Sequence, residues 1–173
     1  MDTPDTVAQP YAINFVCSGN ICRSPMAEVI MRSLAEEAGL GSSLRIISTG
    51  TGDWHVGEHA DPRTTAALAR HGFDGSAHRA RKFQPEHYEE FDLLVALDRS
   101  HERVLRAGAT TDEDADRVSL LLSFDPAQAH LRDVPDPYYA DDAVFDAVFV
   151  MIRKACEQLF RQIQPAIRSG ASR

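Results

Sequence analysis

The stretch Ile13–Pro25, which reads Ile-Asn-Phe-Val-Cys-Ser-Gly-Asn-Ile-Cys-Arg-Ser-Pro, organises the rest of the chain. Its first residues are apolar and predict a buried strand that ends at Cys17. A short loop follows, and Arg23 then opens a helical pattern in which a proline near the first turn is well tolerated. Cys17 and Arg23 therefore bracket five residues between the end of a strand and the start of a helix.

This junction has the chemistry of an anion site that holds a reactive sulfur. Backbone N–H groups from Ser18 to Arg23 can converge on an anion, and the helix dipole favours negative charge there. The same field favours the nucleophilic thiolate form of Cys17. The planar fork of Arg23 suits two phosphate oxygens. We therefore expect the loop to bind a phosphate dianion and Cys17 to attack its phosphorus.

The other residues of the loop complete this interpretation. Gly19 allows an unusual backbone angle in a tight loop. Asn20 tolerates a left-handed conformation and can fix the loop by side-chain hydrogen bonds. Ser24 can donate its hydroxyl to the thiolate, which stabilises the charged sulfur and helps it to leave in a second step. Ile21 and Cys22 belong to the same phosphate-binding set.

Cys22 has two interpretations that the sequence leaves open. It is either a resolving thiol, which forms a disulfide with Cys17 under oxidation and protects that residue from over-oxidation, or a packing residue beneath the loop. With Cys156, the chain has three cysteines, too few and too unevenly spaced for a disulfide framework or a zinc cluster. We expect no metal and no other cofactor, and a reducing compartment fits this cysteine usage.

Length and composition are those of an ordinary globular protein. The 173 residues, 43% hydrophobic and 25% charged, predict one domain over residues 1–173, with residues 1–10 as a loose lead-in. The net charge of −8 argues against nucleic-acid and membrane partners. No apolar run is long enough to span a bilayer, and Met1–Gln9 is polar and acidic, unlike a signal peptide. We therefore expect a cytoplasmic protein. We also expect a monomer, a state that these observations do not decide.

Strands alternate with helices along the chain. This order predicts parallel pairing with right-handed crossovers, and so an α/β three-layer sandwich with a central four-stranded parallel sheet, flavodoxin- or Rossmann-like. The expected strands are Tyr11–Val16, Leu44–Ser48, Phe91–Leu97 and Val118–Phe124, and the expected helices follow Pro25 and Asp61 and cover Arg99–Ala107 and Asp141–Ile167.

Ligands of such sheets sit beyond the C-terminal ends of the strands. Four segments should therefore meet at one rim: the loop after Cys17, Thr49–Gly57, Asp98–Ser100 and Asp125–Tyr139. The last of these supplies a candidate acid, Asp136, which has a proline on each side. Stiff flanking residues suit a carboxyl that must be positioned for proton transfer. Asp133 is the competing carboxylate in the same segment.

The motif Val-Cys-Ser-Gly-Asn-Ile-Cys-Arg-Ser-Pro, together with the late Asp-Pro-Tyr-Tyr, resembles the low-molecular-weight protein tyrosine phosphatase family, roughly from Ala12 to the final helix. The resemblance implies hydrolysis of phosphotyrosine through a cysteinyl-phosphate. It implies Cys17 as nucleophile, Arg23 as phosphate clamp and Asp136 as general acid and then base. It also implies a network that holds the loop, made of Asn20, Ser24, Ser48 and His78.

The resemblance extends to the substrate cleft. Trp54 and Tyr138 match its aromatic walls, Tyr139 lies beside them, and Asp98 and Ser100 match a further segment after the third strand. Two flat walls above a deep loop suit a phenyl phosphate better than the shorter phosphoserine. The implied partners are phosphotyrosine-containing proteins, with inorganic phosphate or a similar oxyanion as product or inhibitor.

Two details refine the resemblance. The segment around Trp54, Gly-Thr-Gly-Asp-Trp-His-Val-Gly, is similar to secreted bacterial members of the family, notably the actinobacterial kind, so secretion without a signal peptide is left open. A related branch that resembles protein-arginine phosphatases carries threonine where this chain has Ile21, and the isoleucine favours phosphotyrosine.

Two other functions compete with this one. An arsenate reductase, which resembles this loop and fold, needs further redox cysteines around Leu97–Arg106, and none is present there. A silent phosphate-binding or adaptor domain would lack Cys17, Arg23 or Asp136, and all are present.

Overall fold

The structure is a computed structural model that describes residues 9–168. A four-stranded parallel sheet forms its centre, in the order β2-β1-β3-β4, which confirms the predicted α/β architecture. The loose lead-in predicted over residues 1–10 lies outside the described residues except for its last two. The strands are β1 (Tyr11–Cys17), β2 (Leu44–Gly50), β3 (Leu93–Ala96) and β4 (Val118–Leu120).

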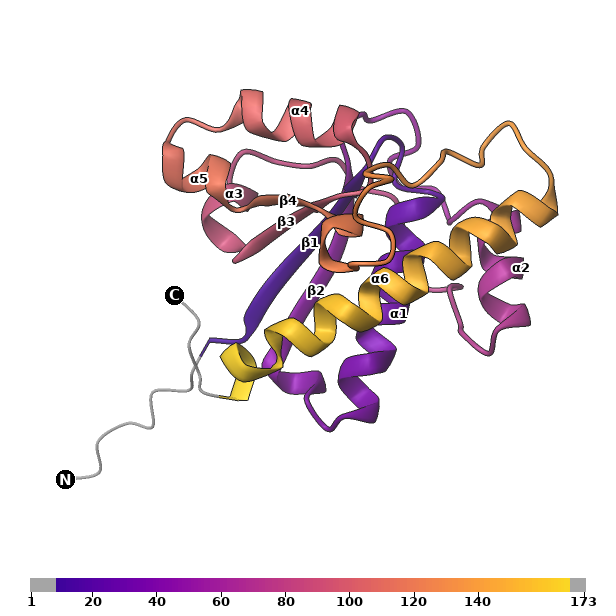
Figure 1. Cartoon of the computed structure of the whole chain (residues 1–173). Coiled ribbons are helices and arrows are strands. Elements are labelled where there is room, and N and C mark those ends of the chain that lie inside the picture. The colour runs from indigo at the N-terminus through magenta and orange to yellow at the C-terminus, as the bar shows by residue number, and fades with distance from the viewer. Residues whose placement is uncertain (1–8, 169–173) are drawn as a thin grey trace.

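Helices cover both faces of the sheet (Figure 1). One face packs against α1 (Arg23–Glu37), α2 (Pro62–Arg70) and the long α6 (Asp142–Arg168). The other carries α3 (His87–Glu90) and α4 (Arg99–Gly108), with α5 (Asp112–Asp116) against α4 and β4. Among the described residues, no helix is long and apolar enough to cross a membrane.

Alternation along β1 divides the core in two. Ile13 and Phe15 join the cluster beneath α1 and α6, whereas Ala12 and Val16 join the cluster beneath α4. Successive side chains of a strand point to opposite faces, so one short strand anchors both helical layers. A central strand buried on both faces explains why this segment reads as a continuous apolar run.

The prediction for the fourth strand was wrong beyond Leu120. The strand ends there, and Leu121–Phe124 forms a 3₁₀ helix, η2. Leu121 and Leu122 both pack into the cluster beneath α6. A strand would send neighbouring side chains to opposite faces, so the tighter turn is what buries both leucines on one side. The third strand is also shorter than predicted, at Leu93–Ala96.

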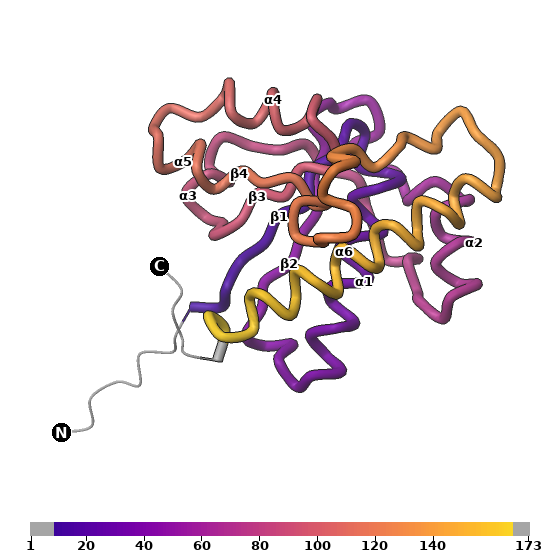
Figure 2. Tube along the Cα trace, in the orientation of Figure 1, coloured from indigo at the N-terminus to yellow at the C-terminus, as the bar shows by residue number. Residues whose placement is uncertain are grey.

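The strand order places the site. The chain leaves β1 toward β2 on one side and later returns to β3 on the other side, so the crossover direction reverses between β1 and β3. Ligand crevices of parallel sheets form at this switch point, outside the carboxyl ends of the strands. Cys17 ends β1, and Asp98 follows β3. The start of β1 and the end of α6 lie at the opposite end of the molecule (Figure 2).

Candidate active site

Cys17 lies buried at the carboxyl end of β1, with its Sγ 2.9 Å from the hydroxyl oxygen of Ser24. The side-chain amide of Asn20 donates to the same Ser24 oxygen at 2.8 Å. Because that oxygen accepts from Asn20, the Ser24 hydroxyl has one hydrogen to give, and two acceptors lie within its reach: the sulfur of Cys17 at 2.9 Å and the Thr49 carbonyl at 3.4 Å. The shorter contact favours donation to the sulfur. This arrangement can stabilise a thiolate, since hydrogen bonds to a charged group favour the charged form.

Four backbone carbonyls of the loop accept hydrogen bonds from segments that pack outside it. The pairs are Thr51 N–H to Cys17, Gly52 N–H to Ser18, Asp61 N–H to Ile21 and His78 Nε2–H to Asn20, at 2.8, 3.0, 2.9 and 2.6 Å.

The N–H groups of the same loop differ from these carbonyls in their hydrogen bonding. Within residues 9–168, none of the N–H groups from Ser18 to Arg23 donates to a protein oxygen. Buried N–H groups are rarely left without an acceptor. These donors are contiguous, adjoin the sulfur of Cys17 and lead into the N-terminus of α1. The loop is therefore built to receive an anion.

The unusual backbone angle expected at Gly19 falls on its neighbour instead. Asn20 has a φ of 58°, in the left-handed region that asparagine tolerates, whereas Gly19 is absent from the described residues with positive φ. A Cβ at Gly19 would lie 2.9 Å from the ring of His55, so a larger residue there would displace that side chain. Gly50 is needed for space, since its Cβ would lie 2.5 Å from the backbone carbonyl oxygen of Ser18.

The structure brings the four predicted supporting residues together behind the loop. Asn20 donates to Ser24 and, at 2.9 Å, to Ser48, and its own carbonyl accepts from His78. Ser48 in turn donates to Glu28 Oε1 at 2.9 Å. Burial lowers the pKa of His78, so the ring is neutral and serves as a structural donor.

Arg23 is 3% exposed and anchored through one nitrogen of its guanidinium. Its Nη1 donates to Asp98 Oδ2 at 2.7 Å and to the Val134 carbonyl at 2.8 Å. Its Nη2 lies 3.8 Å from Asp136 Oδ2. Burial alone would raise the pKa of Asp98, but hydrogen bonds from Ser100 and Arg23 outweigh it and hold that pKa at about 2. Asp98 is therefore a permanent anionic anchor for Arg23.

The two candidate acids, Asp136 and Asp133, differ in their position relative to the cavity. Asp136 lines the cavity with a half-exposed side chain, and its Oδ1 accepts the Tyr138 N–H at 3.1 Å. Asp133 is bound by Arg99 through three side-chain contacts and the Arg99 N–H. These bonds hold the pKa of Asp133 below its usual range. Only the first of these two carboxylates borders the cavity.

Aromatic side chains form the rim of a cavity of about 340 Å³. Trp54 is 70% exposed, Tyr138 is 37% exposed and Tyr139 is 95% exposed. Arg63 fixes the loop that carries the two tyrosines, because its guanidinium donates to the Tyr138 carbonyl at 2.8 Å. The lining residues are Cys17, Ser18, Gly19, Ile21, Cys22, Arg23, Trp54, His55, Asp136, Tyr138 and Tyr139.

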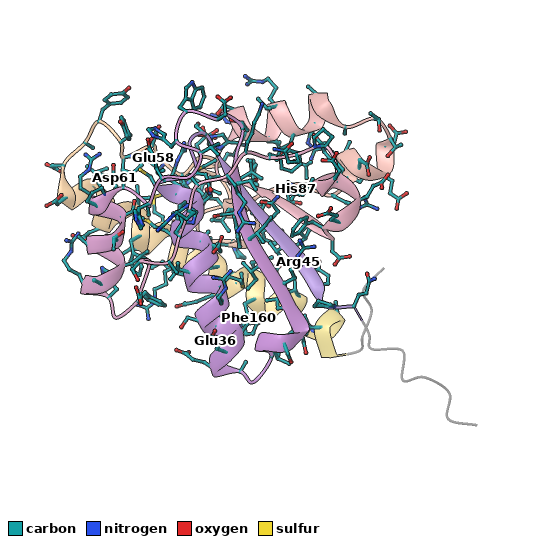
Figure 3. All side chains as sticks on the ribbon, turned by 180° about the vertical axis from the view of Figure 1, so that it is seen from behind. Glu36, Arg45, Glu58, Asp61, His87 and Phe160 are labelled. Carbon is teal, nitrogen blue, oxygen red and sulfur yellow. The ribbon has the colours of Figure 1, made fainter. Side chains whose placement is uncertain are left out.

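The loop after β2 forms part of this rim. Seen from behind in Figure 3, the labelled Glu58 and Asp61 lie in the upper part of the molecule, and Glu36 lies at the far end of α1. Glu58 Oε2 is 2.7 Å from Nδ1 of His55, which lines the cavity. Asp61 caps α2.

The positions of Ser100 and Cys22 limit the roles that these two predicted site residues can have. Ser100 is outside the cavity lining, and its N–H and hydroxyl donate to Asp98, the N-cap residue of α4. Cys22 lies at the cavity wall but is buried, and burial raises the pKa of its thiol to about 12. This thiol therefore stays protonated, in contrast to the role expected of Cys17.

Three residues of the site were missed from the sequence: Glu28, His55 and His101. His101 had a readable signal, since Asp98 and His101 have the spacing of a reciprocal helix cap, with the side chain at the third position contacting the N-cap backbone. For Glu28 the sequence signal was misleading, because its spacing to Arg32 is that of an ion pair on an exposed helix face, i to i+4. His55 adjoins Trp54 but carried no separate signal.

Comparison with known proteins shows the family to which this chain belongs. The family model for low molecular weight phosphotyrosine protein phosphatase matches residues 12–169, and the chain belongs to this family. A low molecular weight protein-tyrosine-phosphatase from Streptomyces coelicolor is 48% identical over 163 residues, which cover 94% of this chain and 99% of that protein. The expected family resemblance is thereby confirmed.

Two further matches extend over nearly the whole chain. Low molecular weight protein-tyrosine phosphatase A from Mycobacterium bovis is 44% identical over 168 residues, covering 96% of this chain and 100% of that protein. The crystal structure of YfkJ from Bacillus subtilis, 36% identical, superposes with a TM-score of 0.85 and covers 92% of this chain and 98% of that chain. Both matches support the fold and the family.

Proposed function

We propose that this protein hydrolyses phosphotyrosine monoesters in proteins through a cysteinyl-phosphate intermediate. The observation that carries the proposal is the loop of free N–H groups from Ser18 to Arg23 around the sulfur of Cys17. These donors match the equatorial oxygens of a phosphoryl group, and Arg23, whose Nη2 lies 3.8 Å from Asp136 Oδ2, lines the same cavity.

The first step forms a bond between Cys17 sulfur and phosphorus and breaks the bond from phosphorus to the tyrosine oxygen. Asp136 gives its proton to that leaving oxygen. In the second step, Asp136 takes a proton from water, the water oxygen bonds to phosphorus and the thiolate leaves, stabilised by the Ser24 hydroxyl. The products are the tyrosine hydroxyl and inorganic phosphate.

The aromatic rim supports an aryl substrate. Trp54 and the two tyrosines offer flat apolar surface above the loop, which favours a phenyl ring over the short side chain of phosphoserine. We extend the proposal to action as a monomer in the cytoplasm. Comparing peptides that carry phosphotyrosine, phosphoserine or phosphoarginine tests this preference, and faster hydrolysis of either alternative would contradict it.

The test of the chemistry is para-nitrophenyl phosphate hydrolysis without added metal. We expect Cys17→Ser to abolish turnover and Asp136→Asn to lower kcat by roughly 100-fold, the range for loss of a general acid. Asp133→Asn is the matched control, since that carboxylate is bound by Arg99, and it should change kcat little. Rapid mixing should show a burst of nitrophenol. Full activity in Cys17→Ser would refute the proposal.

A further inference from the structure

The first turn of α4 contacts the Cys17–Arg23 loop through His101, which no step of the proposed reaction uses. This side chain is 1% exposed. Its Nε2 lies 2.8 Å from the hydroxyl oxygen of Ser18, and its Nδ1 lies 3.2 Å from the backbone nitrogen of Asp98. Ser18 lines the cavity directly after Cys17. A buried imidazole thus holds a hydroxyl at the cavity wall.

The direction of these hydrogen bonds follows from the available donors. The Asp98 N–H can only donate, so Nδ1 of His101 accepts it and carries no hydrogen. The alternative, Nδ1–H donating to Asp98 Oδ1 at 3.3 Å, is disfavoured because that oxygen already accepts three hydrogens from Ser100 and His101.

The charge state of His101 completes the assignment. Burial, together with the nearby positive charge of Arg23, lowers the pKa of His101 to about 4. The ring is therefore neutral near pH 7, and its single hydrogen is on Nε2. Nε2–H donates to Ser18 Oγ, and His101 cannot act as a base toward that hydroxyl.

The Ser18 hydroxyl is left with one hydrogen to give. Its oxygen accepts from His101, and no protein group in residues 9–168 accepts its hydrogen. A serine hydroxyl whose oxygen is held by a donor can rotate its hydrogen toward an acceptor that comes within reach, such as an oxygen of a ligand in the cavity. The cavity that Ser18 lines also contains Cys17, Arg23 and Asp136, the groups proposed to surround a phosphomonoester.

We propose that Ser18 is a substrate-binding residue whose hydroxyl donates a hydrogen bond to an oxygen of the bound phosphomonoester, and that His101 is its positioning residue. This inference rests on the proposed function. Asp98 connects it to the phosphate clamp, because Asp98 accepts from Arg23 while its N–H orients His101. One helical turn thereby aligns two donors, the Ser18 hydroxyl and the Arg23 guanidinium.

Four variants distinguish the contribution of the Ser18 hydroxyl from that of His101, which positions it. Ser18→Ala removes the donor, and Ser18→Thr keeps it. His101→Asn keeps an acceptor near the Asp98 N–H but cannot reach Ser18, whereas His101→Gln places an amide nitrogen near the position of Nε2. The measurements are kcat/KM for para-nitrophenyl phosphate, the competitive inhibition constant of inorganic phosphate, and the melting temperature of each variant.

We expect Ser18→Ala and His101→Asn each to lower kcat/KM by roughly tenfold, the effect of losing one hydrogen bond to a charged group. The double variant should be no worse than Ser18→Ala, because both changes remove the same interaction. Ser18→Thr and His101→Gln should recover most of the loss. A parallel loss of phosphate affinity would place the contact on a non-bridging oxygen, and an unchanged phosphate constant would place it on the ester oxygen.

Wild-type kcat/KM and phosphate affinity in a folded Ser18→Ala would overturn the inference. Multiplying losses in the double variant would overturn the positioning role of His101. These failures are distinct from failure of the proposed function, which would appear as turnover that persists in Cys17→Ser. Calorimetry of phosphate binding to Cys17→Ser, with and without Ser18→Ala, measures how much the Ser18 hydroxyl contributes to phosphate affinity in the absence of turnover.

Discussion

The floor and the rim of the cavity differ in how their side chains are fixed. On the floor, Cys17, Asn20 and Arg23 are buried, and each has a hydrogen-bond partner within the protein. On the rim, Trp54 is 70% exposed and Tyr139 is 95% exposed. The groups that would act on phosphorus are thus arranged before a ligand arrives, whereas the groups that would contact the rest of the substrate face solvent.

The difference teaches where each kind of property resides. Floor residues carry both stability and the proposed reaction, so changes there should move the free energy of unfolding and kcat together. The rim side chains Trp54 and Tyr139 are mostly exposed, so changes there should move KM and leave stability alone. Four experiments can break or sharpen this contrast.

Asn20 offers the strongest test. Asn20→Ala removes the amide that donates to Ser24 and Ser48 and strains a left-handed backbone, so we expect about 2–3 kcal/mol of destabilisation. We expect roughly 100-fold loss of kcat, because the Ser24 hydroxyl is no longer directed at the sulfur. Chemical denaturation and steady-state kinetics measure the two effects.

Asn20→Gly is the matched control for that experiment, since glycine adopts the left-handed conformation freely. It should regain about 1 kcal/mol of the lost stability but none of the lost kcat. Recovery of kcat in this variant would show that backbone geometry, and not the side-chain network, organises the floor.

The floor should also be sensitive to acid. Burial holds the pKa of His101 at about 4, below its ordinary 6.5, with Arg23, Asp98, Asp136 and Asp133 as the charges around it. Between these values the unfolded chain binds a proton that the folded chain does not, so stability falls as pH drops from about 6.5 to about 4. The loss approaches roughly 3 kcal/mol.

The measurement is the free energy of unfolding against pH for wild type and His101→Gln. The variant has no group that titrates at this position, so its curve should be flatter between pH 6.5 and 4. Below pH 4 both curves should fall together, since the Asp98 pKa of about 2 keeps that carboxylate charged in the fold after it is protonated in the unfolded chain. Identical slopes above pH 4 would contradict the assigned environment of His101.

Trp54 tests the rim. We expect Trp54→Ala to raise KM for para-nitrophenyl phosphate about fivefold, since an aromatic contact contributes about 1 kcal/mol, with melting temperature unchanged. Inorganic phosphate has no ring, so its inhibition constant should not change. Val56→Ala is the control, because Val56 is 55% exposed but outside the cavity lining. A lower melting temperature in Trp54→Ala would mean that the rim is part of the core.

Cys22 should give the smallest effect on activity. Its thiol is buried and protonated, so we expect Cys22→Ser to retain most of the wild-type kcat. If Cys22 is a resolving thiol for Cys17, the variant should recover less activity with dithiothreitol after peroxide treatment. Equal recovery in both proteins would leave Cys22 with a packing role.

The sequence was informative wherever a residue lies within the motif or at a strand end. The strand–loop–helix junction, the parallel sheet and the meeting of the loops after β1, β2 and β3 follow from local pattern and from the topology of parallel sheets. The network among Asn20, Ser24, Ser48 and His78 came from the family resemblance, and the structure shows its hydrogen bonds.

Contacts between distant segments were not predictable. The Val134 carbonyl accepts a hydrogen bond from Arg23, which lies 111 residues away in the chain. Nothing in the composition of either segment predicts this contact. His101 reaches Ser18 across 83 residues for the same reason. The end of β4 was missed because two adjacent leucines fit a strand as well as a 3₁₀ turn, and the choice depends on which face of the sheet α6 covers.

The anchoring of Arg23 has a consequence for binding. A free arginine side chain loses about 2 kcal/mol of conformational entropy when it is held in one rotamer. Here Asp98 and the Val134 carbonyl already restrict that side chain through Nη1, leaving the Nη2 side turned toward the cavity. The entropy is therefore lost when the chain folds, and a phosphate that binds meets a guanidinium with few rotamers left to freeze.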